Sequence, residues 1–117
     1  MAEFTLLHNP RCSTSRAALD AAEGADVEVV RYLDTPLSYA DLLALIGKLE
    51  DAPGDLVRRD ARFKELGLSD TDVETPEQVA TVLAEHPALM QRPVLVRGDR
   101  AIIGRPKDRV PAFLRGE

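Results

Sequence analysis

Hydrophobic residues fall into short runs near the two ends of the chain, and these runs predict strands. Residues 4–7 are apolar, and residues 27–32 are β-branched with loose alternation, which is typical of strands. Residues 92–97 and 100–104 each contain a further apolar run next to arginine, and the glycine-aspartate pair between them favours a tight turn. The sequence therefore predicts two separate strands early in the chain and an antiparallel hairpin near its end.

Between these strands, apolar residues recur at helical spacing. The alanine-rich segment after the first strand predicts one helix, and Ser38 can cap another. Residues 53–59 and 62–66 fit two shorter helices. A stronger signal begins at Thr75, a capping residue followed by proline in the first helical position and glutamine in the third. Residues 106–114 predict a closing helix. The apolar positions of the two longer inner helices are Leu42, Leu45, Ile46 and Leu49, then Val79, Val82 and Leu83.

The order of these elements predicts the fold class. A strand pair joined by a helix is parallel, and the late hairpin adds antiparallel strands, so we expect an α/β fold with helices on the faces of a mixed sheet. This is the outline of a thioredoxin-like domain with a helical insertion. We expect a single domain over residues 1–117, with the insert over roughly residues 38–90.

Composition narrows the class of protein. The chain has 117 residues, 44% of them hydrophobic, which is enough for one core. The net charge of −5 argues against a nucleic-acid partner, and the few aromatic residues argue against a stacking platform for bases. Neither a membrane span nor a signal peptide is predicted. A lone cysteine fits a reducing compartment, so we expect a cytoplasmic protein, and we expect it to be a monomer.

Cys12 is the candidate nucleophile. It is the only cysteine, which excludes an internal disulfide and a cysteine-rich metal site. It lies where the first strand gives way to a helix, and unpaired N–H groups and aligned dipoles at a helix start favour a thiolate. Arg11 and Arg16 add positive charge, and the neighbouring hydroxyl groups can donate to sulfur. The alternative is a small buried hydrophobic residue, which is how many free cysteines behave.

Arginines at the ends of elements are candidates for anion binding, because a guanidinium stays charged and matches the oxygens of tetrahedral oxyanions. Arg92 precedes the predicted hairpin and Arg105 follows it, so the turn of the hairpin brings them together. Each precedes a proline, which in a tight turn can be cis. Arg58 or Arg59, after the middle helix, is a third candidate. The alternative for each is an ordinary solvated arginine.

Other cysteine chemistries fit the spacing poorly. A phosphatase loop requires arginine six residues after the cysteine, where this chain has Ala18. A dithiol motif requires a second cysteine where it has Ser15, so an external thiol must complete any redox cycle. His8 either raises the thiolate fraction of the cysteine or fills the sheet edge. His86 fits a favourable charge at a helix end, and the two histidines and one cysteine do not predict a metal site.

The segment His8-Asn9-Pro10-Arg11-Cys12-Ser13-Thr14-Ser15-Arg16 resembles the active-site loop of the glutaredoxin-coupled arsenate reductases, the ArsC family. The resemblance extends along nearly the whole chain and implies a thioredoxin-like fold with a helical insertion. Its further motifs are Tyr32-Leu33 with Pro36, Leu56-Val57-Arg58-Arg59, Glu65-Leu66-Gly67-Leu68, Arg92-Pro93-Val94-Leu95-Val96 and Gly104-Arg105-Pro106.

The resemblance also implies a mechanism. Cys12 would attack arsenate, and His8 would help to keep it ionised. The adduct would be held by Arg58, Arg92 and Arg105, with Arg59 competing for the place of Arg58. The family implies no bound cofactor. An external thiol, glutathione or mycothiol, would be the co-substrate, and glutaredoxin or mycoredoxin the electron donor.

Two other functions remain open at this stage. A different single-cysteine thiol oxidoreductase would use the same nucleophile without a preference for arsenate. Spx-type regulators share the fold and bind RNA polymerase, but they usually carry a two-cysteine switch, which Ser15 interrupts here.

Overall fold

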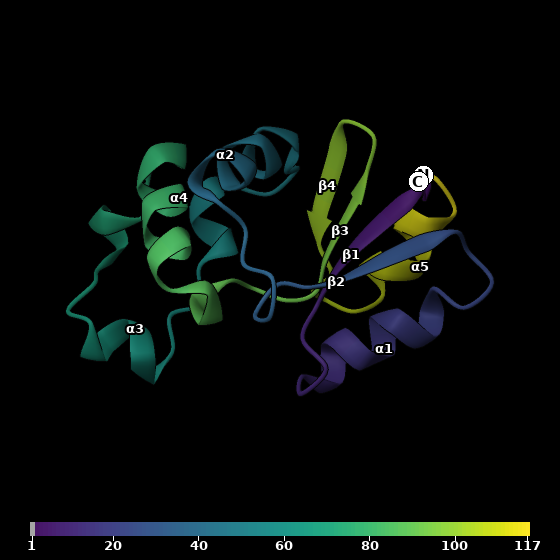
Figure 1. Cartoon of the computed structure of the whole chain (residues 1–117), viewed down its shortest axis with the longest axis horizontal. Coiled ribbons are helices and arrows are strands. Elements are labelled where there is room, and N and C mark those ends of the chain that lie inside the picture. Colours follow the sequence, from purple (N-terminus) through teal and green to yellow (C-terminus); the bar gives the residue numbers. More distant parts are fainter. Residues whose placement is uncertain (1) are drawn as a thin grey trace.

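A four-stranded mixed sheet organises the chain in the computed structural model, which describes residues 2–117 (Figure 1). The strand order is β2-β1-β3-β4. β1 (Phe4–His8) is parallel to β2 (Val27–Arg31) and antiparallel to β3 (Val94–Arg97), which pairs with β4 (Arg100–Ile103) in the hairpin. The predicted α/β fold with a mixed sheet is thereby confirmed.

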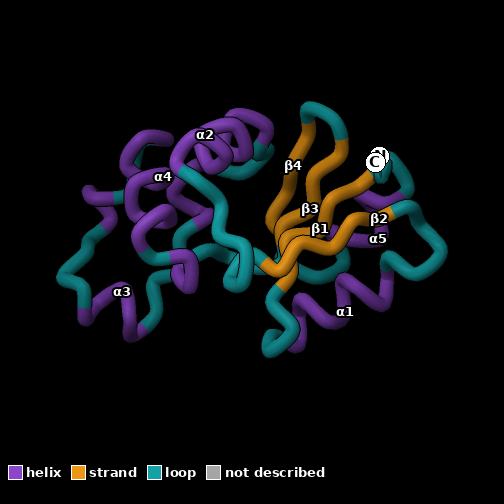
Figure 2. Tube along the Cα trace, in the orientation of Figure 1, coloured by secondary structure: helices purple, strands orange, loops and turns teal. Residues whose placement is uncertain are grey.

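Helices lie on both sides of this sheet (Figure 2). One face is covered by α1 (Ser13–Ala21) and α5 (Arg109–Leu114). The connection from β2 to β3 forms the insert, which packs against the opposite face (Figure 1). The insert contains α2 (Tyr39–Lys48), α3 (Ala61–Glu65), α4 (Pro76–Glu85) and three single-turn 3₁₀ helices at Pro53–Leu56, Asp70–Asp72 and Pro87–Leu89. All of these lie within the predicted insert.

Several predicted boundaries were wrong, and each has a physical reason. The helix expected over residues 53–59 stops at Leu56, because Val57 pairs with Met90 in an isolated bridge and Arg58 N–H donates to the Leu89 carbonyl at 2.8 Å. The strand expected from residue 92 begins at Val94, since the intervening Pro93 has no N–H for a ladder. The closing helix begins at Arg109, after a turn.

The core has two parts, one on each face of the sheet. Because successive side chains of a strand point to opposite faces, Phe4 and Leu6 pack against α1 and α5, whereas Leu7 packs against the insert. β1 is one of the two inner strands and contributes to both parts, and its Leu6 has no exposed surface. Burial of apolar side chains on both faces fixes the register of this strand.

Acidic residues after α2 attach the insert to the hairpin. Glu50 N–H donates to the Ala101 carbonyl at 2.8 Å. The Asp51 carboxylate accepts the N–H of Ile103 at 3.0 Å and the guanidinium of Arg109 at 2.9 Å. One side chain thus joins the insert to β4 and to α5.

The two ends of the hairpin meet beside the end of β1. Gly104 N–H donates to the Pro93 carbonyl at 2.8 Å, which sets the residues that follow β4 next to those that precede β3. The peptide bonds Arg92-Pro93 and Arg105-Pro106 are both cis. The predicted approach of Arg92 and Arg105 is therefore observed.

Gly104 lies where a larger residue has no room. A Cβ atom there would come within 2.7 Å of Pro93 Cγ and 2.9 Å of Val110 Cγ2. We expect Gly104→Ala to lower the free energy of unfolding by about 1–3 kcal/mol, as overpacking does, measured by urea denaturation. The matched control is Gly47→Ala in the exposed part of α2, where nothing lies within 4 Å of the added atom; this change should be neutral or stabilise by up to about 1 kcal/mol. Equal effects would contradict the packing described here.

Candidate active site

Cys12 is held at the first turn of α1 by a compact loop. Its N–H donates to the Asn9 carbonyl at 3.0 Å, and its own carbonyl accepts the N–H of Arg16 at 2.9 Å, which starts the helix. The Asn9 side chain accepts the N–H of Arg11 at 2.9 Å and so closes a turn around Pro10. The cysteine is 9% exposed, so most of its surface is buried.

The environment of the thiol favours its ionised form. Burial alone would raise the pKa of Cys12, but a hydrogen bond from Arg92 and the N–H groups of Ser15 and Thr14 outweigh it, and the pKa is lowered from its ordinary value. Arg105 adds a second cation, with Nη2 at 3.4 Å from Sγ. A lowered pKa increases the thiolate fraction at neutral pH, which is what a nucleophilic cysteine requires.

Arg105 and Arg58 face one open pocket of about 250 Å³, which Arg59, Asp60 and Gln91 also line. Arg105 is fixed by a hydrogen bond from Nε to the Arg92 carbonyl at 2.7 Å, so its remaining nitrogens can serve both the pocket and the sulfur. Arg58 forms an ion pair with Asp60 at 3.1 Å. The structure thus brings Cys12, Arg92 and Arg105 together and places Arg58 on the same pocket as Arg105.

Arg59 has a different role in the structure. It donates to the carbonyls of Gly54 and Val57, the latter at 2.6 Å, and forms an ion pair with Asp70 at 3.2 Å. Its guanidinium also stacks on the ring of Phe63 at 5.7 Å. Because these partners hold the insert together, the geometry favours Arg58 over Arg59 for anion binding.

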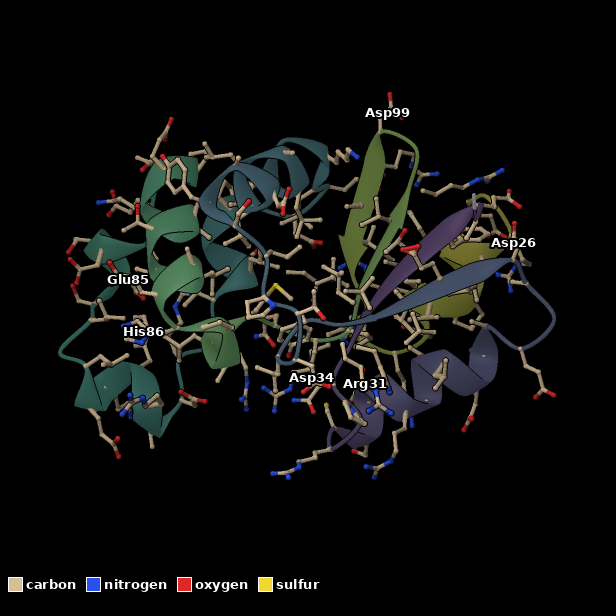
Figure 3. All side chains as sticks on the ribbon, viewed as in Figure 1. Asp26, Arg31, Asp34, Glu85, His86 and Asp99 are labelled. Atoms are coloured by element: carbon tan, nitrogen blue, oxygen red, sulfur yellow. The ribbon has the colours of Figure 1, made fainter. Side chains whose placement is uncertain are left out.

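His8 lies beneath the loop, with Nδ1 at 2.7 Å from the Ser15 hydroxyl. The same hydroxyl accepts the N–H of Asn9 at 3.0 Å. Burial, helped by the charges of Arg31 and Arg16, lowers the pKa of His8 and favours its neutral form. Arg31, labelled in Figure 3, is the last residue of β2 and pairs with His8 in the parallel ladder. The role of His8 in keeping the cysteine ionised stays a prediction, and a neutral ring would act through hydrogen bonding and not through charge.

Ser15 and Asn9 are the residues that sequence reasoning missed. From the sequence, Ser15 is the place of an absent second cysteine and one of the hydroxyl groups near the thiol. The side chain is fully buried and links His8 to the backbone of the loop. The available signal was Asn9 before Pro10, since asparagine commonly closes such turns with its side chain.

His86 lies apart from these residues. It sits next to Glu85 at the end of α4, on the far side of the insert (Figure 3), with 3.9 Å between Nε2 and the carboxylate. Within residues 2–117, no group of three or more histidine, cysteine, aspartate or glutamate side chains is placed to hold a metal ion. No helix in this range is long and apolar enough to cross a membrane.

The family model described as ArsC family matches residues 7–113 of this sequence, which includes every residue of the site. The chain belongs to the ArsC family. A protein of Neisseria meningitidis named arsenate reductase is 40% identical over 118 residues, covering 97% of this chain and all of the relative. An Escherichia coli arsenate reductase is 36% identical over 99 residues, covering 82% of this chain and 70% of the relative.

Solved structures agree with this ArsC assignment. The structure described as arsenate reductase from Vibrio cholerae superimposes with a TM-score of 0.83 at 33% identity and covers 93% of this chain and 95% of its own. The similarity therefore includes both the sheet and the insert, and it confirms the predicted thioredoxin-like fold with a helical insertion.

Burial of His8 predicts how stability depends on pH. Because the folded-state pKa of His8 lies below its unfolded value, the unfolded chain binds the proton more readily, and the free energy of unfolding falls as the pH drops below about 6.5. We expect this fall between pH 7 and pH 5 in urea denaturation, and a smaller fall in His8→Gln. The control is His86→Gln, which should keep the full decline. An unchanged decline in His8→Gln would contradict the burial of a neutral ring.

Proposed function

We propose that this protein reduces arsenate to arsenite, with Cys12 as the nucleophile. The observation that carries the proposal is a buried thiol that accepts a hydrogen bond from Arg105 at 3.4 Å and whose pKa is lowered by Arg92 and by backbone N–H groups. Its support from comparison is that relatives covering nearly the whole chain carry the name arsenate reductase.

The proposed site answers an electrostatic problem. A thiolate and an arsenate anion repel each other, and the repulsion is strong where water is excluded. Three guanidinium groups, from Arg58, Arg92 and Arg105, offset it and stabilise negative charge that moves onto the oxygens as sulfur approaches arsenic. Arginine suits this task better than lysine, because its planar fork can donate two parallel hydrogen bonds to one oxyanion.

Because the chain has a single cysteine and cannot form an internal disulfide, external thiols must supply the electrons. Cys12 would displace one oxygen of arsenate as water and form a sulfur–arsenic(V) bond. Reduction to arsenic(III) takes two electrons, which two external thiols supply by becoming a disulfide. Overall, one arsenate and two thiols give one arsenite, one disulfide and one water, and Cys12 returns to its thiol form. We infer glutathione or mycothiol as the small thiol, and glutaredoxin or mycoredoxin as the protein donor, in a reducing compartment.

The nucleophile is tested by Cys12→Ser. We expect arsenate-dependent consumption of NADPH with one of three coupled systems: glutathione–glutaredoxin, mycothiol–mycoredoxin or thioredoxin. Cys12→Ser should lose all of it, because a hydroxyl is essentially not ionised at neutral pH. Activity retained by the folded variant would refute the mechanism. Wild-type protein that is inactive with all three, yet exchanges with a disulfide probe, would instead indicate another thiol oxidoreductase.

The two neighbouring arginines give opposite predictions. Arg58→Ala should lower kcat/KM for arsenate about 10- to 100-fold, the loss expected for a charged hydrogen bond, with little effect on the melting temperature. Arg59→Ala should lower the free energy of unfolding by about 1–3 kcal/mol while folded protein keeps most of its kcat/KM. The measurements are steady-state kinetics and urea denaturation on both variants. The reversed pattern would assign the anion to Arg59.

A further inference from the structure

The pocket that Arg58 and Arg105 face also contains an acidic residue. Asp60 lines it, together with three arginines and Gln91. A carboxylate repels any anion that enters the pocket, so its presence among guanidinium groups needs an explanation. Holding an arginine in place does not require a charge, because Arg105 on the same pocket is held by the neutral backbone carbonyl of Arg92. The acidic group therefore has a further use.

The Asp60 carboxylate has acceptor capacity left. Its Oδ1 accepts the N–H of Phe63 at 3.1 Å as the cap of α3, and its Oδ2 lies 3.1 Å from Nη1 of Arg58. A carboxylate has about four lone-pair sites, and these contacts use two of them. The side chain is 32% exposed and the residue lines the pocket, so a molecule bound there can reach the remaining sites.

The other charged groups on the pocket can only donate hydrogen bonds. A guanidinium has no acceptor atom, whereas an ionised carboxylate has no hydrogen to donate. The side-chain amide of Gln91 can do either, and its backbone N–H is already bound to the Leu56 carbonyl at 2.7 Å. Of the described residues that line the pocket, Asp60 is thus the one whose side chain can only accept.

Tetrahedral oxyanions differ in whether they carry a hydrogen at neutral pH. Arsenate and phosphate keep at least one hydroxyl group, because their last acid dissociation occurs well above neutral pH, whereas sulfate keeps none. A hydroxyl of the bound anion can donate to the carboxylate, which turns a repulsive contact into a charge-assisted hydrogen bond. Sulfate has no hydrogen to donate, so its oxygens and the carboxylate repel each other. Such a repulsive contact with the wrong ligand is a common source of specificity.

We propose that Asp60 is a specificity-determining residue: its carboxylate accepts a hydrogen bond from a hydroxyl group of the bound oxyanion and disfavours oxyanions that have none. The arginines supply affinity for tetrahedral anions in general, and Asp60 restricts the class to arsenate and phosphate against sulfate. Because Arg58 and Asp60 are paired, they offer one donor and one acceptor side by side to neighbouring oxygens of the same anion. The inference rests on the proposed function for the place of the anion, but it concerns binding and not turnover.

The test is Asp60→Asn, which removes the charge and keeps a residue that caps helices equally well. Binding is measured as protection of Cys12 from alkylation by iodoacetamide, with phosphate and with sulfate at one pH and constant ionic strength. We expect wild-type protein to be half-protected by phosphate at a concentration about tenfold lower than by sulfate. Asp60→Asn should bind sulfate more tightly and bring the two concentrations within about threefold of each other. Asp60→Ser, a second uncharged cap, should lose discrimination in the same way.

The matched control is Asp99→Asn, which makes the same change in net charge. Asp99 lies in the turn between β3 and β4 (Figure 3), at the opposite end of the hairpin from Arg92 and Arg105. This variant should keep the wild-type ratio of the two half-protection concentrations.

The ratio of these concentrations separates specificity from a purely structural role. If Asp60 only capped α3 and held Arg58, its replacement would weaken phosphate and sulfate binding by the same factor. The ratio would then stay unchanged, which would overturn the proposal. Protection of the wild-type thiol by both anions equally, or by neither, would overturn it as well. The assay needs no reduction of arsenate, so a ratio that changes as expected supports the proposal even if arsenate turnover is absent.

Discussion

The pairing of β1 with a strand on each side is the constraint on which the site depends. β1 lies between β2 and β3, buried on both faces, and it ends at His8. The chain must then leave the sheet through the cysteine loop, between the residue after β2 and the residues before β3. Tyr32, Arg92 and Cys12 come from distant parts of the sequence, and this one strand end sets their spacing. Any slip of its register by one residue would turn the loop to the other face.

Much of this arrangement could be predicted from the sequence, because its signals are local. The Thr75 capping box, the glycine turn of the hairpin and the apolar run of β1 each depend on a few neighbouring residues, and all are observed. The predicted helix over residues 53–59 was wrong because Val57 is held by Met90, a contact distant in sequence. The choice between Arg58 and Arg59 needed the positions of Asp70 and Phe63. The burial of Ser15 could not be predicted either, because it depends on the contact between its hydroxyl and His8, and a short polar run by itself suggests exposed side chains.

The candidate site is a local exception to the charge of the whole chain. The net charge is −5, yet the groups around the thiol are mainly arginines. Asp60 is the acidic residue on the pocket, and it also accepts the N–H of Phe63 as the cap of α3. It therefore fixes the Arg58 guanidinium, in the way that the Arg92 carbonyl fixes that of Arg105. A guanidinium that is already fixed by a hydrogen bond or ion pair loses little conformational entropy when an anion binds. The same contacts with the anion therefore give a higher affinity.

The Asp51 contact has a consequence for the size of what can bind. Arg92 and Arg105 belong to the sheet, whereas Arg58 belongs to the insert, and the insert is attached to β4 and α5 through Asp51. The spacing between Arg58 and the two hairpin arginines therefore depends in part on contacts of Asp51, which no anion in the pocket would touch. A substitution of Asp51 would therefore change the distance between Arg58 and the other two arginines while all three arginines remain in the sequence.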